Sequence, residues 1–198
     1  WQRPFLFCTT EDLYTQTLVV PYLIPMLENA GANVFTPRER DWQRNEVIVD
    51  NDQRSSGYLE LTTKEPWKLT GKPGFALHGG TYADLENPFQ AGSARQVKAR
   101  KRRKRLSEAS YQPYFPEPGR YAVYVSYQTL PKSVDDAEYT VYHKGQATTF
   151  HVNQQMGGGT WVYLGTFDFD RGSNAYNRVV LSNYSRSKGV VTTDAVRF

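Results

Sequence analysis

The stretch that decides the fold, residues 157–198, reads GGGTWVYLGTFDFDRGSNAYNRVVLSNYSRSKGVVTTDAVRF. Its first part alternates in polarity, and four aromatic residues occupy odd positions: Trp161, Tyr163, Phe167 and Phe169. In a regular strand these side chains share one face. Residues 172–174 interrupt the pattern with turn residues, after which residues 179–181 and 190–198 resume it. The stretch predicts a β-sandwich whose final strand returns into the core.

The same pattern of short strands and turns extends upstream to Val47. Lys144-Gly145 predicts a tight hairpin turn between two alternating strands. Strands this short and this evenly spaced indicate an antiparallel jelly-roll β-sandwich, so the fold class is mainly β. We expect residues 63–104, rich in Gly, Pro and charge, to form long connections. The candidate strands are residues 47–51, 58–62, 75–78, 106–111, 121–128, 138–143, 147–153, 160–169, 178–183 and 190–198.

Residues 1–46 have a different pattern. Thr9-Thr10-Glu11-Asp12 is a typical helix start, and apolar residues then recur at helical spacing up to Gly31. Pro21 and Pro25 interrupt that spacing and predict a kink or a late start. Residues 33–36 read as a short buried strand. We therefore expect a short N-terminal α/β segment of one helix and one strand, and a β-sandwich domain over residues 47–198.

The basic charge of the chain is local. The net charge is +4, yet seven of the eight residues Lys98–Arg105 are Lys or Arg, so the chain without those seven would carry −3. A basic field over the whole protein, which dedicated nucleic-acid-binding proteins have, is absent. The run is either a solvated loop or a contact surface for acidic polymers, and the contact candidates are Arg100, Arg102, Arg103 and Arg105.

Other features of the whole sequence limit the kinds of protein to which this chain can belong. No apolar run is long enough for a membrane span, no signal peptide opens the chain, and the first residue is Trp1 rather than Met. We therefore expect a piece of a longer protein, with no membrane and no nucleic acid as partner. Cys8 is the single cysteine, which excludes an internal disulfide.

Residues 47–198 carry several motifs that occur together in one known family. They are VIVDND, PEPGRYAVYVSY, YTVYHKGQATTFHVNQ, GGGTWVYLGTFDF and TTDAVRF. In this combination the segment resembles the carbohydrate-binding-like domain of golvesin C-termini and bacterial xanthan lyases. The resemblance implies a jelly-roll fold and a place in secreted bacterial proteins that act on polysaccharide or cell wall. It does not imply that this domain cleaves anything.

Residues 1–46 resemble the middle of a zinc-dependent N-acetylmuramoyl-L-alanine amidase. The matching pieces are Glu11 at a helix start, MLENAGANV over residues 26–34, and the turn TPRERD over residues 36–41. In that family a Glu at this helix start joins two histidines on zinc, so the resemblance makes Glu11 a possible zinc ligand in the full parent protein. The matching histidines are absent here. We expect no cofactor and no catalytic residue in this fragment.

A sugar site requires an exposed aromatic face together with amide, carboxylate or guanidinium groups at a loop edge. The loop residues with that character are Trp67, Tyr82, Asn87, Arg95, Asn153, Gln154 and Gln155. Asp50, Asp52 and Asp194 admit two interpretations: a structural calcium site, since first and last strands adjoin in many jelly rolls, or ordinary carboxylates at strand ends. The sequence alone favours the ordinary carboxylates.

Together these features favour a non-catalytic carbohydrate-binding-like accessory domain of a secreted, periplasmic or cell-surface enzyme that degrades polysaccharide or cell wall. The expected partner is a polysaccharide or peptidoglycan, acidic ones included. Two alternatives stay open. One is a fragment of a zinc amidase with the sandwich inserted in it, and the other is a structural spacer domain.

Overall fold

The computed structural model describes residues 25–27, 29–30, 46–52, 57–75, 87 and 90–198. The chain divides into two compact units, residues 1–41 and 42–198. In the first unit the described residues form part of one helical turn, in which the Ala30 amide donates to the Met26 carbonyl at 3.1 Å. Glu11, the rest of the predicted helix and the predicted strand 33–36 lie outside the described residues. No helix in the described part of the chain is long and apolar enough to cross a membrane.

The described part of the second unit contains twelve strands. Ten segments were expected, and most of them coincide with observed strands. The strands are β1 (Ile48–Asp50), β2 (Tyr58–Leu61), β3 (Lys68–Pro73), β4 (Ser93–Lys98), β5 (Glu108–Tyr111), β6 (Gly119–Val125), β7 (Ala137–His143), β8 (Gln146–Val152), β9 (Val162–Phe169), β10 (Arg178–Ser182), β11 (Val190–Thr193) and β12 (Ala195–Arg197).

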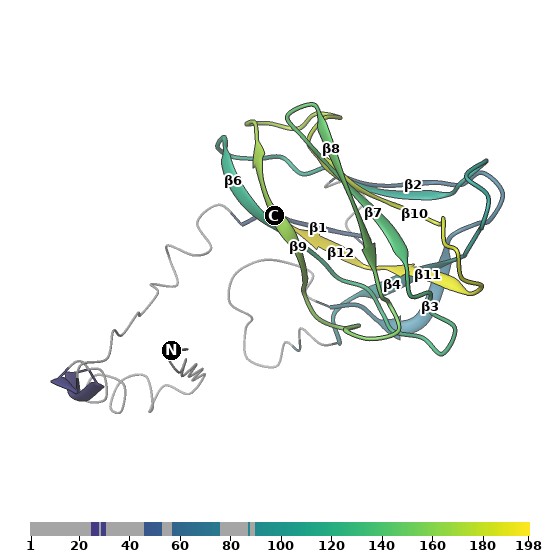
Figure 1. The fold of residues 1–198 in the computed structure, drawn as a ribbon, viewed down its shortest axis with the longest axis horizontal. Coiled ribbons are helices and arrows are strands. Elements are labelled where there is room, and N and C mark those ends of the chain that lie inside the picture. Colours follow the sequence, from purple (N-terminus) through teal and green to yellow (C-terminus); the bar gives the residue numbers. More distant parts are fainter. Residues whose placement is uncertain (1–24, 28, 31–45, 53–56, 76–86, 88–89) are drawn as a thin grey trace. The chain divides into compact units, whose positions relative to one another are not determined.

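These strands form antiparallel sheets around one core (Figure 1). One sheet has the order β2-β5-β10-β7-β8, a second has β1-β12-β6-β9, and a third has β11-β4-β3. The second and third sheets are linked directly, because β11 runs into β12 with only Asp194 between them. The predicted antiparallel β-sandwich is therefore confirmed.

The core lies between the sheets and collects side chains from all three. The buried side chains include Val49 and Val196 of the second sheet, Tyr139 and Leu181 of the first, and Val97 of the third. At one end an aromatic group closes the core, with the rings of Phe115 and Phe169 stacked at 4.5 Å and Phe198 edge-on to Phe115 at 5.4 Å. The final strand does return into the core, because Val196 and Phe198 are both buried.

The aromatic residues of β9 do not share one face as the odd spacing predicts. Phe167 and Phe169 face the core, but Tyr163 is exposed and pairs across the sheet with Tyr124. The reason is a β-bulge: Val123 pairs with Gly165 and Tyr124 with Tyr163, so one residue of β9 is skipped. A bulge reverses the side-chain alternation beyond it, and polarity alone does not reveal its position.

Residues 63–104 are more regular than expected, because β3 and β4 lie within them. Both strands are mostly polar, reading KLTGKP and SARQVK, so they lack the alternation by which a strand is recognised. The continuous strand expected over residues 190–198 is divided at Asp194 between two sheets. The tight turn at Lys144-Gly145 is present, with φ of 45° and 77°.

Candidate functional site

The predicted sugar-contact residues do not converge in the described part of the chain. Trp67 is a core residue, 6% exposed, whose ring N–H donates to the Glu108 carbonyl at 3.2 Å. This burial leaves the ring no face for a sugar, which corrects the expectation for Trp67. Tyr82 lies outside the described residues, and Asn87 is exposed.

Gln154 is the second correction, because its side chain is fully buried and serves the fold. Its amide oxygen accepts from the Thr192 N–H at 2.9 Å, and its amide nitrogen donates to the Thr192 carbonyl at 2.8 Å and to the Tyr139 hydroxyl at 3.2 Å. The side chain thus pairs with β11 as a neighbouring strand would. Asn153 and Gln155 beside it are exposed, at the end of β8 opposite the hairpin turn.

Arg95 is held within the third sheet by an acidic partner. Its Nε and Nη2 donate to the two carboxylate oxygens of Glu60 at 2.7 and 3.0 Å. This hydrogen bonding raises the pKa of the Arg95 guanidinium. A guanidinium engaged in a bidentate pair has little capacity left for a ligand.

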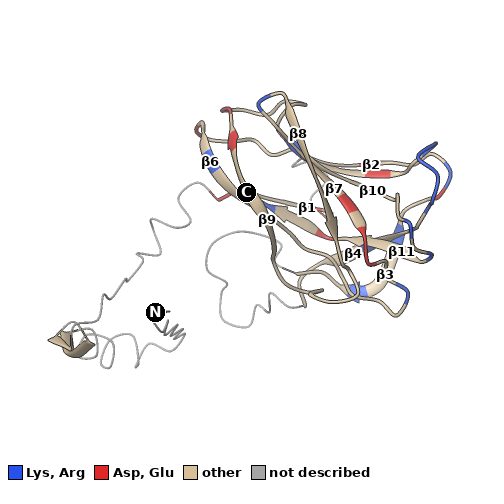
Figure 2. Cartoon of the chain, viewed as in Figure 1, with Lys and Arg blue, Asp and Glu red and all other residues tan. Residues whose placement is uncertain are grey.

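The basic run forms the turn between β4 and β5, and its residues 101–105 are all exposed, as the solvated-loop interpretation expects. Figure 2 shows it as a nearly continuous blue stretch. Arg103 donates to both carboxylate oxygens of Glu138 at 2.9 and 2.6 Å and lies 3.8 Å over the Tyr184 ring. Arg100 lies 3.9 Å from a Glu65 carboxylate oxygen, and its main chain pairs with Asn183.

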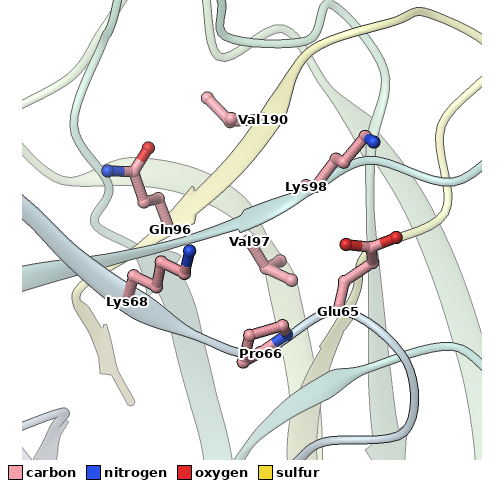
Figure 3. A pocket seen from close by; sticks show the side chains of 7 residues that line it. All are labelled: Glu65, Pro66, Lys68, Gln96, Val97, Lys98 and Val190. Atoms are coloured by element: carbon pink, nitrogen blue, oxygen red, sulfur yellow. The ribbon is translucent and has the colours of Figure 1, made fainter.

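This geometry divides the four predicted anionic-polymer contacts. Arg103 pairs with Glu138 while its side chain stays 59% exposed, whereas Arg100 is only 16% exposed beside Glu65 and is therefore the less accessible of the two. Residues 101–105 are all exposed on the turn, and those among them without a carboxylate partner in the described part of the chain are Lys101, Arg102, Lys104 and Arg105. A pocket of about 280 Å³ adjoins the turn and is drawn in Figure 3; it is lined by Glu65, Pro66, Lys68, Gln96, Val97, Lys98 and Val190.

A different group of loop residues meets the requirements for a sugar site. It lies at the end of the sandwich where the β7–β8 turn approaches the β9–β10 connection. Tyr176 is 69% exposed there and, with four other residues, lines an open pocket of about 370 Å³. The other lining residues are Lys144, Gly145, Asp170 and Asn174.

The pocket is held in shape by hydrogen bonds from its own loops. Buried Asn177 links the two connections, because its Oδ1 accepts from the Lys144 N–H at 3.3 Å and its Nδ2 donates to the Asp170 carbonyl at 3.3 Å. Asn174 Oδ1 accepts from the Tyr176 N–H at 2.9 Å, which orients the exposed tyrosine. Lys144 Nζ lies 3.8 Å from Asp170 Oδ1, and the two side chains are 50% and 59% exposed, so this ion pair stands at the rim of the pocket in contact with solvent.

A neighbouring loop extends this end of the domain. The β5–β6 connection is tied to the β9–β10 connection by two main-chain hydrogen bonds between Phe115 and Gly172, at 3.0 and 2.9 Å. Gln112 Nε2 also donates to Ser173 Oγ at 3.0 Å. Tyr114, on the β5–β6 connection, is 61% exposed.

The residue types expected of a sugar site also occur here, at residues that were not among the predicted contacts. Asn174 and Tyr176 follow the turn residues 172–173 within three positions. They provide an amide and an aromatic side chain at the edge of one loop. What the sequence could not reveal was that the hairpin turn at Lys144 lies beside this loop.

A second exposed aromatic surface lies on the outer face of β6 and β9. The rings of Tyr124 and Tyr163 are 5.2 Å apart and tilted by 49°. The Arg197 guanidinium lies 5.3 Å from the Tyr124 ring and is itself paired with Glu46 at 2.6 Å. This surface offers aromatic area without a pocket and therefore provides a natural control for the pocket at Tyr176.

Metal ligation by side chains alone has no support in the described part of the chain. No group of three or more His, Cys, Asp or Glu residues there could hold a metal ion. Glu11, the possible zinc ligand of the parent protein, lies outside the described residues, so that assignment stays a prediction.

The sequence matches the profile of the Golvesin C-terminal domain family over residues 76–198. It is 30% identical over 152 residues to a xanthan lyase of Bacillus sp. (strain GL1), covering 77% of this chain and 14% of that protein. Among solved structures it is similar to a Paenibacillus xanthan lyase, with 25% identity, a TM-score of 0.56, and coverage of 77% of this chain and 13% of that one. A further match is the C-terminal CBM6 of LamC, a marine laminarinase from Zobellia galactanivorans, with 16% identity, a TM-score of 0.44, and coverage of 77% and 98%.

Proposed function

Because the chain belongs to the Golvesin C-terminal domain family, we propose that its β-sandwich is a non-catalytic carbohydrate-binding domain of a larger polysaccharide-degrading enzyme. The likeness to two xanthan lyases supports the proposal, since xanthan lyases are named for their action on a polysaccharide. The chain spans about one-seventh of the length of those relatives, 14% and 13%. It therefore corresponds to one module among several.

The observation that carries the proposal is the exposed Tyr176 ring beside a carboxylate, an ammonium and an amide at one rigid loop end. Sugar rings present an apolar C–H face and a rim of hydroxyl groups, so their recognition combines an aromatic platform with polar groups of fixed position. Tyr176 supplies the platform. Asp170 accepts hydrogen bonds from hydroxyl groups, and the Lys144 ammonium and the Asn174 amide N–H groups donate to their oxygens.

The exposed basic side chains extend the proposal to acidic polysaccharides. Lys101, Arg102, Lys104 and Arg105 stand on a turn that is tied to the domain by Arg103, so binding of a polyanion has to order their side chains but not the main chain. Lys68 and Lys98 line the pocket beside that turn (Figure 3). Attraction of this kind is screened over about 8 Å at physiological ionic strength, so binding through the turn weakens as salt is added.

The parent protein is proposed to act outside the cell or at its surface, on a polysaccharide or on cell wall. The family and the xanthan lyase relatives support polysaccharide as the ligand more directly than peptidoglycan. The amidase alternative rests on residues 1–46 alone and stays a prediction, with zinc and Glu11 as its checkable elements.

The experiment compares Tyr176→Ala with Tyr163→Ala, each removing one exposed tyrosine, in affinity electrophoresis through gels containing xanthan or a neutral β-glucan. We expect the unchanged chain and Tyr163→Ala to be retarded and Tyr176→Ala to lose most of the retardation. Stacking of one aromatic ring contributes about 1–1.5 kcal/mol, which is a 5- to 12-fold loss of affinity. If the unchanged chain is retarded in no polysaccharide gel, the domain is a spacer and the proposal fails.

A further inference from the structure

Three acidic residues gather where the first strand of the sandwich meets the last. Asp50 ends β1, where its Cα pairs with that of Ala195, and the Asn51 N–H donates to the Asp194 carbonyl at 3.0 Å. Asp50 and Asp194 have no exposed surface, and Asn51 is 3% exposed. Two carboxylates are thus buried at diagonal positions of one strand pairing, and charge of one sign in such a place is costly unless it is compensated.

Each of the two carboxylates has one oxygen with donors and one without. Asp194 Oδ2 accepts from the Phe75 N–H and the Ser126 hydroxyl, both at 2.8 Å, whereas its Oδ1 has no hydrogen-bond partner. Asp50 Oδ1 accepts from the Asp52 N–H at 2.7 Å, whereas its Oδ2 has none. Buried carboxylate oxygens are normally satisfied, so these two point to a missing ligand.

The free oxygen of Asp194 lies among other acceptors rather than donors. A Cβ added to Gly74 would lie 2.4 Å from Asp194 Oδ1, 2.7 Å from the Ala91 carbonyl oxygen and 3.0 Å from the Ser93 carbonyl oxygen. Three oxygen acceptors therefore approach one another beside Gly74, so closely that even a Cβ would not fit between them. Like partial charges that converge in this way repel one another unless a cation lies between them.

Asp52 adds negative charge but is not free to act as a ligand. Its two carboxylate oxygens accept from the Ser93 main-chain N–H at 2.5 Å and the Ser93 hydroxyl at 2.6 Å. Its charge still raises the pKa of both buried carboxyls, although burial is the larger cause. Burial and the neighbouring Asp194 and Asp52 charges raise the pKa of Asp50 to about 8, and burial with the Asp52 charge raises that of Asp194 to about 7.

We propose that Asp50 and Asp194, together with the main-chain carbonyl groups of Ala91 and Ser93, bind a Ca²⁺ ion that fastens the first strand to the last. A set of carboxylate and carbonyl oxygens without nitrogen or sulfur is what Ca²⁺ prefers, and Ca²⁺ tolerates irregular coordination by six to eight oxygens. Mg²⁺ demands a near-ideal octahedron and keeps several of its waters, which a buried site of main-chain carbonyls does not offer. Because two carboxylates are complemented by main-chain groups, the site does not require a third acidic ligand. It revises the expectation that this fragment holds no metal.

This site does not depend on glycan binding. The buried carboxylates lie at the β1–β12 junction, whereas the proposed sugar site is built from the β7–β8 turn and the β9–β10 connection. The ion would stabilise the fold, so its effect can be measured as thermal stability whether or not a polysaccharide binds.

The experiment uses the full 198-residue chain, dialysed against EGTA and then titrated with Ca²⁺ or Mg²⁺ alone. Isothermal titration is expected to give one Ca²⁺ per chain, and saturating Ca²⁺ is expected to raise the Tm by roughly 5–10 °C. Mg²⁺ is expected to give little shift. Absence of both the stoichiometric Ca²⁺ and the Tm shift in the unchanged chain overturns the proposal.

Two isosteric variants locate the ion. Asp50→Asn removes one proposed ligand charge and is expected to abolish the Ca²⁺-induced shift while leaving the Ca²⁺-free Tm equal or higher, because repulsion at the site falls. Asp168→Asn, an exposed residue of β9, is the matched control and should keep the full shift. A full Ca²⁺ response in Asp50→Asn would place the ion elsewhere. If Asp50→Asn does not fold, the Ca²⁺ titration of the unchanged chain still decides.

Discussion

Replacing Gln154 by Ala should destabilise the domain strongly, although the residue lies in a connection. The side chain satisfies both the N–H and the carbonyl group of Thr192, which is itself fully buried. A buried polar group without a partner costs about 1–3 kcal/mol. In this variant both the N–H and the carbonyl group of Thr192 would lose the partner that Gln154 provides. Allowing for water that enters the vacated space, we expect the free energy of unfolding to fall by about 3 kcal/mol.

The assay is equilibrium urea denaturation, supported by the Tm. For a chain of this length a loss of about 3 kcal/mol corresponds to a Tm lower by roughly 6–12 °C. Gln155→Ala is the matched control, since this neighbouring glutamine is exposed and surface changes usually stay within about 0.5 kcal/mol. A loss below about 1 kcal/mol for Gln154→Ala would refute the structural role given to this side chain.

Three further changes test other parts of the structure. Arg103→Ser should lower the Tm, because it leaves the buried Glu138 carboxylate without its charged partner and with only the Ser182 hydroxyl, whereas Arg102→Ser on the same turn should not. Equal Tm values would mean that the Arg103–Glu138 pair contributes nothing to stability. Gly165→Val should cost about 1–3 kcal/mol in urea denaturation, because a Cβ there would lie 2.8 Å from the Phe167 ring, and Ala147→Val on an exposed strand position should not. A chain of residues 42–198 should melt in one cooperative transition by calorimetry, and failure to fold would mean that the two compact units share a core.

The predictable part of the fold was the part with clear periodicity. The alternation in β6 and β7 and the turn at Lys144-Gly145 follow from local sequence, because apolar residues that face a core recur at every second position of a half-buried strand. The strands β3 and β4 were missed because their polar sequences carry no such alternation. The outward turn of Tyr163 was missed because it depends on a bulge set by the pairing of two strands.

The candidate site was less predictable, for a related reason. Trp67 and Gln154 have the residue types of sugar contacts, but the fold uses the first for its core and the second for a strand edge. Tyr176 and Lys144 are 32 positions apart, and only the tertiary structure places them at one pocket. The buried pair Asp50 and Asp194 is a similar case, because the burial and the unpartnered oxygens are properties of the folded chain.

The most direct test of the central claim is a titration of the isotopically labelled chain with a xanthan-derived oligosaccharide, followed by amide chemical shifts in NMR. The account predicts that the shifts that move most belong to Lys144, Asp170, Asn174 and Tyr176, with saturation at a single affinity. Shifts confined to the outer face around Tyr124 and Tyr163, or no change with any oligosaccharide, would contradict it.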